Sequence, residues 1–579
     1  MNVMQRRWMV GLVVLNLVIF FAIFAALYLR REAIRQTLAD VTGEEDSRYQ
    51  LRALGFLVLS LFQTPHDTAD YAPMPYTDMP PFGVNTFFEQ EVEEAKIRAS
   101  MQLIRDAGFH FIRQEFPWED LEQPRKGEFY DTKFNHSTWD KYDRIVALAH
   151  EYGLEIIARL DHPPNWTRAD GAARGNFAPP DNYDDYGDFV SAVVSRYKGK
   201  IKYYQLWNEP NIYPEWGEQP VSAQDYTRLL KIGYTRAKQA DPNAVIISAG
   251  LAQTLETGPR NVSDLIFLQQ MYDAGAKNYF DILAVMNYGL FTGPGDHRAD
   301  PTRTNFSRPI LLREIMVKNG DANKPMWAME IGWNALPLSF TDAPFGRVTE
   351  AQQARYAAQA YARAQTEWSW MGVMNYWFFK RAYDDERNQP FFYFRLFDPD
   401  FKPLPAYAAL KAYIATARWL GKGFHQETDW VLQYSGDWQT AAYGARVTDG
   451  YRIGQVGDTL DFDFRGDEVD LALAPNPYGG VIQARIDNGA WRALDLRATD
   501  PLAQHSVTLA KNLWGDRHHV QVRVTRGELR LDGVIVRQTN AVVLQILAWA
   551  ALGIALLCGA AIAVLLRRAR RSNLAGAAA

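Results

Sequence analysis

The fold of the central region is decided by the stretch Tyr203-Tyr204-Gln205-Leu206-Trp207-Asn208-Glu209-Pro210-Asn211. A short apolar run ends there in Asn-Glu-Pro, and proline cannot donate a hydrogen bond to a neighbouring strand. The run therefore predicts a strand that ends where Glu209 leaves the sheet. The stretch Pro325-Met326-Trp327-Ala328-Met329-Glu330-Ile331-Gly332-Trp333 repeats the pattern with Glu330.

Strand-like runs and helical patterns alternate on both sides of these stretches. The predicted strands cover residues 83–86, 110–113, 155–159, 203–207, 244–248, 282–285, 326–329 and 372–376. Apolar residues recur at helical spacing between them, for example over 91–107, 138–152 and 222–240. Eight such units predict an α/β fold, a (β/α)8 barrel over residues 81–420. A doubly wound open sheet is the alternative, but no glycine-rich phosphate loop follows any strand.

The pattern changes to period two between residues 424 and 537. Leu460, Phe462 and Phe464 alternate with charged residues, and turn signals such as Asp532-Gly533 separate the runs. This predicts a small, jelly-roll-like β-sandwich as an accessory domain. The domain could bind sugar or brace the barrel, and the lack of an aromatic strip at its outward positions favours bracing. Residues 30–80 are predicted to be a connector.

Two apolar segments, residues 8–29 and 541–566, contain no charged residue. Each exceeds the roughly 20 residues that a helix needs to cross a bilayer. A cleaved signal peptide is the alternative for the first segment, although its apolar run is longer than a usual signal core. Four arginines directly follow the second segment, which places the basic tail 567–579 in the cytoplasm. We therefore expect a two-pass cell-membrane protein with both termini cytoplasmic, both folded domains extracytoplasmic, and the lipid bilayer as a partner.

Composition excludes several other classes of protein. The chain has 579 residues and a formal net charge of -5, so no basic face for nucleic acid is expected. Its one cysteine, Cys558, cannot form an intrachain disulfide. No group of cysteines and histidines has the spacing of metal ligands, so neither a metal nor a cofactor is expected.

Glu209 and Glu330 are the candidate catalytic residues. They lie 330 − 209 = 121 residues apart, at the ends of the predicted fourth and seventh strands, which face each other across such a barrel. Cleavage of a glycosidic bond needs such a pair: one carboxylic acid protonates the leaving oxygen, and the other attacks the anomeric carbon or activates water. Two strand-end ion pairs are the simpler structural explanation, but two glutamates in matching surroundings are rare by chance.

Residues from about 83 to 420 resemble the clan A glycoside hydrolases, most closely family 39 and its bacterial exopolysaccharide-hydrolase relatives. Asn208-Glu209-Pro210 is similar to the strand-four motif of the clan, and Met329-Glu330-Ile331-Gly332-Trp333 to its strand-seven motif. The resemblance implies a retaining mechanism with Glu209 as acid/base and Glu330 as nucleophile. It also implies that Asn208 contacts the sugar 2-hydroxyl.

The resemblance implies three further roles in the site. Arg113 would orient the nucleophile, Tyr288 would contact it, and Trp377 would form the aromatic floor of a sugar subsite. Met286 departs from the clan, which usually has histidine there. Position along the chain adds four residues that we expect to line the cleft or stack on sugar: Trp118, Asp161, His162 and Trp166.

The sequence thus predicts a retaining glycosidase that cleaves O-glycosidic bonds in a polysaccharide or oligosaccharide. The membrane segments and the resemblance favour an extracellular or nascent exopolysaccharide, with exopolysaccharide synthesis or export machinery as a further partner. Two alternatives remain open. One is a transglycosidase in the same site, and the other is a non-catalytic polysaccharide-binding or assembly protein.

Overall fold

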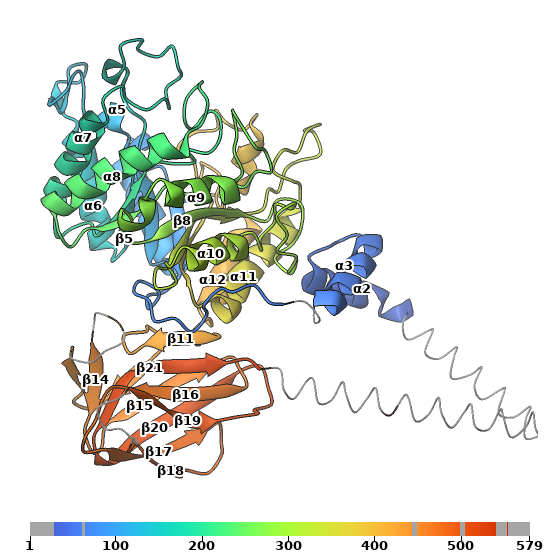
Figure 1. Ribbon diagram of the computed structural model, residues 1–579. Helices are drawn as coiled ribbons and strands as arrows, with labels where there is room; N and C mark the ends of the chain where they lie inside the picture. The colour runs from blue at the N-terminus through green and yellow to red at the C-terminus, as the bar shows by residue number, and fades with distance from the viewer. Residues whose placement is uncertain are drawn as a thin grey trace, which may run out of the picture. The chain divides into compact units, whose positions relative to one another are not determined.

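The computed structural model describes residues 28–60, 64–442, 447, 450–497, 504–539 and 553. These residues form two units (Figure 1). The first contains Met74–Gln365 and Trp370–Ala417 together with the preceding helices. The second contains the chain from Arg418 onward, with Asp70–Pro73 and Thr366–Ser369.

Eight parallel strands form the centre of the first unit, in the order β7-β6-β5-β2-β1-β10-β9-β8. Single bridges from Ile247 to Ile282 and from Leu251 to Val285 join the two edges, so the ring is nearly closed. The predicted barrel is confirmed, and the open-sheet alternative is wrong. The strands are β1 (Phe82–Thr86), β2 (Phe111–Glu115), β5 (Glu155–Leu160), β6 (Tyr203–Leu206), β7 (Val245–Ile247), β8 (Leu283–Tyr288), β9 (Met326–Gly332) and β10 (Met371–Tyr376).

Helices surround these strands (Figure 1). In α6, the apolar residues Tyr142, Ile145, Val146 and Ala149 are buried, as expected for one face of an amphipathic helix. Within residues 74–417, the helices of eight or more residues are α4 (Glu94–Asp106), α6 (Trp139–Glu151), α7 (Tyr183–Arg196), α8 (Ala223–Ala240), α9 (Asp264–Asp273), α10 (Pro309–Lys318), α11 (Glu350–Glu367) and α12 (Pro405–Ile414). The short elements are α5 (Trp118–Leu121), η1 (Phe88–Gln90), η2 (Asn165–Thr167), η3 (Ala276–Asn278), η4 (Pro390–Phe394), β3 (Tyr130–Asp131) and β4 (His136–Ser137).

Aromatic side chains fill the interior of the barrel. The rings of Tyr203 and Trp327 have centroids 4.9 Å apart, and Phe111 packs edge-on against Trp327 at 5.5 Å. All three residues are buried, together with Met329 and Val373. The barrel is therefore a packed core, and the chemistry must take place at one of its ends.

A helical hairpin precedes the barrel, within the segment that the sequence predicts to be a connector. It consists of α2 (Arg31–Thr42) and α3 (Ser47–Ser60). Gly43 ends α2 in the left-handed region, at φ 70°, and a Cβ there would lie 2.5 Å from the backbone nitrogen of Asp296. Arg355 of α11 forms ion pairs with Asp40 (3.1 Å) and Glu45 (2.5 Å). The hairpin is thus packed directly on the barrel.

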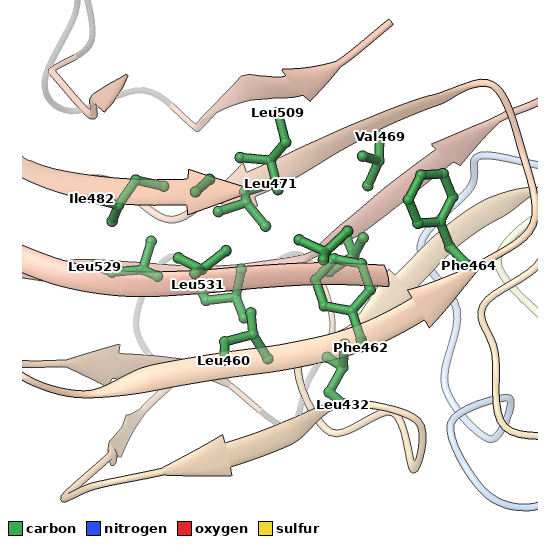
Figure 2. Close-up of a cluster of buried hydrophobic side chains, with 14 of the residues drawn as sticks. Leu432, Leu460, Phe462, Phe464, Val469, Leu471, Ile482, Leu509, Leu529 and Leu531 are labelled. Carbon is green, nitrogen blue, oxygen red and sulfur yellow. The ribbon is translucent and has the colours of Figure 1, made fainter. Parts of the chain in front are cut away.

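The second unit contains two antiparallel sheets, one ordered β13-β14-β21-β16-β19 with β11 beside β21, and the other β12-β15-β20-β17-β18. Leu460, Phe462 and Phe464 of β15 lie in one buried cluster with Leu471 and Leu531 (Figure 2). The predicted all-β domain is confirmed. Its strands are β11 (Gly423–Gln426), β12 (Gln433–Ser435), β13 (Gln439–Ala441), β14 (Tyr451–Gly454), β15 (Thr459–Phe464), β16 (Glu468–Leu473), β17 (Gly480–Ile486), β18 (Arg492–Asp495), β19 (His505–Ala510), β20 (His518–Gly527) and β21 (Leu529–Arg537).

The two predicted transmembrane helices, residues 8–29 and 541–566, lie outside the described residues except for Tyr28, Leu29 and Gly553. The basic tail 567–579 also lies outside them. In the part of the chain that the structure describes, no helix combines the length and the apolar character needed to cross a bilayer.

Replacing Gly43 by alanine is expected to weaken the docking of the hairpin by at least about 2 kcal/mol, because the left-handed backbone and the close approach to Asp296 both oppose a Cβ. Thermal unfolding should occur at a lower temperature, and limited proteolysis should cut faster within residues 31–60. Gly55→Ala is the matched control, because a Cβ at Gly55 meets no atom within 4 Å. Equal behaviour of the two variants would contradict the packing described here.

Candidate active site

Glu209 lies at the C-terminal end of β6, in a turn with unusual backbone geometry. Trp207 and Glu209 both have positive φ, 76° and 37°, a region that costs a non-glycine residue about 1–3 kcal/mol. The Glu209 backbone N–H donates to the carbonyl of Gly250 (3.1 Å), which holds the turn against the chain that follows β7. The side chain keeps partial exposure, so a substrate can reach it.

Glu330 lies within β9 and is 5% exposed. Nη1 of Arg113, on β2, donates to its Oε1 atom at 2.9 Å. The hydroxyl of Tyr288, the last residue of β8, donates to its Oε2 atom. Both carboxylate oxygens are therefore fixed by donors from two other strands.

Arg113 connects this carboxylate to the turn that carries Glu209. Its Nη2 atom donates to Oδ1 of Asn208 (2.8 Å), its Nε atom to Oε1 of Gln205 (2.7 Å), and its Nη1 atom also to Oδ1 of Asn85 (2.7 Å). The guanidinium is 2% exposed. A single buried cation thereby links β1, β6 and β9 to β2.

The surroundings of Glu209 favour its protonated form. Burial raises the pKa of the Glu209 carboxyl well above its usual value, and the negative charges of Glu330 and Glu215 raise it further. Arg113 and Arg159 act in the opposite direction, but their effects are smaller. A carboxyl group with a raised pKa beside an ionised carboxylate is suited to donate a proton.

Asp161 and His162 follow β5 and form a buried ion pair, with Oδ1 of Asp161 and Nδ1 of His162 2.7 Å apart. Arg159 pairs with Asp161 at 2.8 Å and with Glu115 at 2.7 Å. Burial alone would lower the pKa of His162, but the charge of Asp161 raises it to about 9. Burial alone would raise the pKa of Asp161, but the charges of Arg159 and His162 lower it to about 2.

Trp118 requires a correction. It is fully buried, and its ring stacks on Phe189 with centroids 5.2 Å apart and an interplanar angle of 14°. Its Nε1 atom donates to Oε2 of Glu122 at 2.5 Å. The prediction that Trp118 forms a platform for sugar is therefore wrong, because the apolar residues of α7 cover the ring.

The other predicted tryptophans keep partial exposure. Trp166 packs edge-on against Trp118 at 5.7 Å, and its Nε1 atom donates to the carbonyl of Glu122 (3.1 Å). The backbone N–H of Trp377 donates to the carbonyl of Ile331 (2.9 Å), the residue after Glu330. The ring of Trp377 packs against Phe87 at 5.5 Å. Trp377 therefore lies beside β9, next to the residue that follows Glu330. Trp166 lies in η2, which follows β5.

Glu215 belongs to the candidate site, although no pattern in the sequence pointed to it. Nδ2 of Asn208 donates to Oε2 of Glu215 at 3.2 Å, and Nε1 of Trp207 donates to its carbonyl at 3.0 Å. Burial raises the pKa of Glu215, and the charge of Arg159 opposes that shift. Glu215 lies in an irregular loop after β6, where no periodicity marks a residue as functional.

The packing around Met286 explains how a methionine is accommodated at this position. It is 1% exposed, and its Cε atom would lie 2.8 Å from a Cβ built on Gly250. The carbonyl of Gly250 accepts the hydrogen bond of the Glu209 backbone. The methionine therefore packs against the loop that supports Glu209.

Comparison with known proteins supports a glycosidase domain. Residues 73–273 match the family model "Cellulase (glycosyl hydrolase family 5)", so the matched region includes Arg113 and Glu209. The chain is 24% identical over 117 residues to Beta-glucosidase-like SFR2, chloroplastic, of Oryza sativa subsp. japonica (20% of this chain, 18% of that protein). It is 22% identical over 190 residues to Endo-1,4-beta-xylanase A of Xylanibacter ruminicola (32% of this chain, 50% of that protein). The chain thus spans half or less of the length of these curated relatives.

Among solved structures, a family 39 glycoside hydrolase from Bacteroides cellulosilyticus WH2 is 18% identical, with a TM-score of 0.43 over 80% of this chain and 82% of that one. The family match confirms the predicted resemblance to the clan A glycoside hydrolases.

Removal of the charged imidazole tests the ion pair after β5. The pKa of His162 lies above its unfolded value, so its contribution to stability is complete below about pH 6.5 and is lost as the pH rises through about 9. Between pH 6 and 10, the free energy of unfolding should fall by on the order of 3 kcal/mol more in the wild type than in His162→Gln. Denaturant titrations across this range measure the difference. His136→Gln, at an exposed histidine, should follow the wild type.

Proposed function

We propose that this chain is a retaining glycoside hydrolase that cleaves O-glycosidic bonds in a polysaccharide. One observation carries the proposal: a buried, doubly hydrogen-bonded Glu330 lies near a second glutamate, Glu209, whose pKa is raised by burial and by the charge of Glu330. A pair consisting of an ionised carboxylate and a protonated carboxyl group is what double displacement requires. The family match over residues 73–273 supports the same reaction class.

In the proposed mechanism, the carboxylate of Glu330 attacks the anomeric carbon while Glu209 donates its proton to the leaving oxygen. A covalent glycosyl-enzyme forms, and the first product leaves. Glu209, now ionised, then takes a proton from water, and this water attacks the anomeric carbon to release the sugar and free Glu330. Arg113 and Tyr288 hold the carboxylate oxygens in place, and Asn208 is available to a sugar hydroxyl.

The proposed substrate is an extracellular or nascent exopolysaccharide, and the proposed location is the outer side of the cell membrane. The two apolar segments, residues 8–29 and 541–566, support a tether at each end of the chain. The hairpin after the first segment supports contact with lipid, because it exposes Leu51 and Leu59 as well as Arg31. A protein held there would meet polysaccharide at its site of synthesis or export.

Substitution of Glu330 by glutamine should lower the hydrolysis of aryl β-glycosides and of xylan by at least about 1000-fold, because the amide cannot attack the anomeric carbon. A 2-deoxy-2-fluoro glycoside with a good leaving group should label the wild-type peptide that contains Glu330, as measured by mass spectrometry. Glu314→Gln, at a partly exposed carboxylate of α10, is the control and should keep full activity. Unchanged turnover in Glu330→Gln would overturn the mechanism, and longer oligosaccharide products would indicate transglycosylation.

The pH profile tests the role of Glu209. Because Glu209 must be protonated to act as the acid, and because its pKa is raised, kcat/KM should fall as the pH rises through that pKa. With nitrophenyl glycosides, which need little acid assistance, Glu209→Gln should slow turnover and remove the alkaline limb. Retention of the same alkaline limb in this variant would assign the limb to another group.

A further inference from the structure

A cavity of about 640 Å³ lies where the hairpin α2–α3 meets the barrel loops that follow β8 and β9. The hairpin contributes Tyr49, Arg52 and Phe56 to its wall. The barrel contributes residues of two loops, among them Phe291 and Arg347. The cavity is therefore separate from the carboxylates of β6 and β9, and the mechanism proposed above makes no use of it.

The carboxylates in the wall of this cavity already have partners. Three of them form ion pairs with arginines, and the fourth accepts a hydrogen bond from a hydroxyl group. The ion pairs are Glu44 with Arg298, Glu45 with Arg355 and Asp46 with Arg48, and Asp300 accepts from the hydroxyl of Thr302.

One guanidinium in the same wall remains available. Arg52 is exposed and makes no hydrogen bond or ion pair with any described residue. Arg303, in contrast, pairs with Asp296 (3.3 Å), and Arg347 donates from Nη2 to the carbonyl of Phe340. The charge and the several donors of Arg52 suit an anionic group rich in oxygen atoms.

Aromatic side chains border the cavity. Phe291 is 69% exposed and Tyr49 is 54% exposed. Large rings exposed in a wall that also contains guanidinium groups offer flat apolar faces beside charged donors. A pyranose ring that carries a carboxylate presents the matching features, an apolar face and an anionic group.

The cavity also lies close to the reacting centre along the chain. Thr292 is four residues after Tyr288, a span of at most about 14 Å. The carbonyl of Thr292 accepts a hydrogen bond from Nε1 of Trp333 (2.7 Å), and Trp333 follows Glu330 by three residues. One wall of the cavity is therefore in direct contact with the residues that follow β9.

We propose that this cavity is a distal subsite that binds a uronate unit of an acidic polysaccharide, with Arg52 as the main contact for its carboxylate and Phe291 as the stacking surface. The proposal rests on the proposed glycosidase function for the polymer as a whole. It adds that the substrate is acidic and that the hairpin takes part in its recognition.

Binding without turnover tests the subsite separately from catalysis. Full-length Glu330→Gln protein is titrated with a hexamer of galacturonate and with cellohexaose, by calorimetry at low and high salt. The uronate should bind at least about 10-fold more tightly than the neutral hexamer at low salt, and this preference should decrease at high salt. In the Glu330→Gln protein, a second substitution, Arg52→Gln, should weaken uronate binding about 10-fold and leave the affinity for cellohexaose unchanged. Arg52→Lys should retain part of the preference for the uronate.

Arg35→Gln, at an exposed arginine of α2 outside the cavity, is the matched control and should have no effect. Phe291→Ala, at an exposed position, should weaken the binding of the uronate without loss of folding. Absence of uronate binding, equal affinity for the two hexamers, or equal behaviour of Arg52→Gln and Arg35→Gln would overturn the subsite. Failure of the glycosidase proposal would instead appear as unchanged turnover in Glu330→Gln, whatever the titrations give.

Discussion

The buried guanidinium of Arg113 is the interaction on which the site depends. A charge removed from water is tolerated only when its hydrogen bonds are satisfied, and loss of one partner in such a pair typically costs about 3–5 kcal/mol. Arg113 satisfies this condition with Glu330, Asn85, Gln205 and Asn208, which come from or follow β9, β1 and β6. The same bonds that solvate the cation fix the relative positions of the residues of the candidate site.

This network also explains why the two glutamates have different hydrogen-bond partners. Glu330 accepts from a cation and a phenol, whereas Glu209 has no such cation directly on its carboxyl and feels the negative charge of Glu330 instead. The two carboxyl groups are therefore held in different electrostatic surroundings, although both belong to one candidate site.

The sequence predicted the barrel well because strands buried on both faces are short apolar runs, and all eight were recognised. It also selected Glu209 and Glu330 as candidates. Glu209 follows β6 directly before a proline, whereas Glu330 lies within β9, which continues to Gly332. Prediction from the sequence failed where tertiary packing determines the exposure or the position of a side chain. Trp118 looked like an exposed ring, but α7 covers it, and Glu215 lies in a loop without periodicity. The hairpin was missed because its docking depends on Gly43 and on ion pairs with residues about 250–315 positions away.

The contact between Met286 and Gly250 restricts how this site can change over time. A Cβ at position 250 would lie 2.8 Å from Cε of Met286, so the end of this flexible side chain would have to move, and the carbonyl of Gly250 holds the backbone of Glu209. A larger residue at 250 is therefore best accommodated together with a shorter side chain at 286. Substitutions at the two positions are expected to be coupled, because they share one contact.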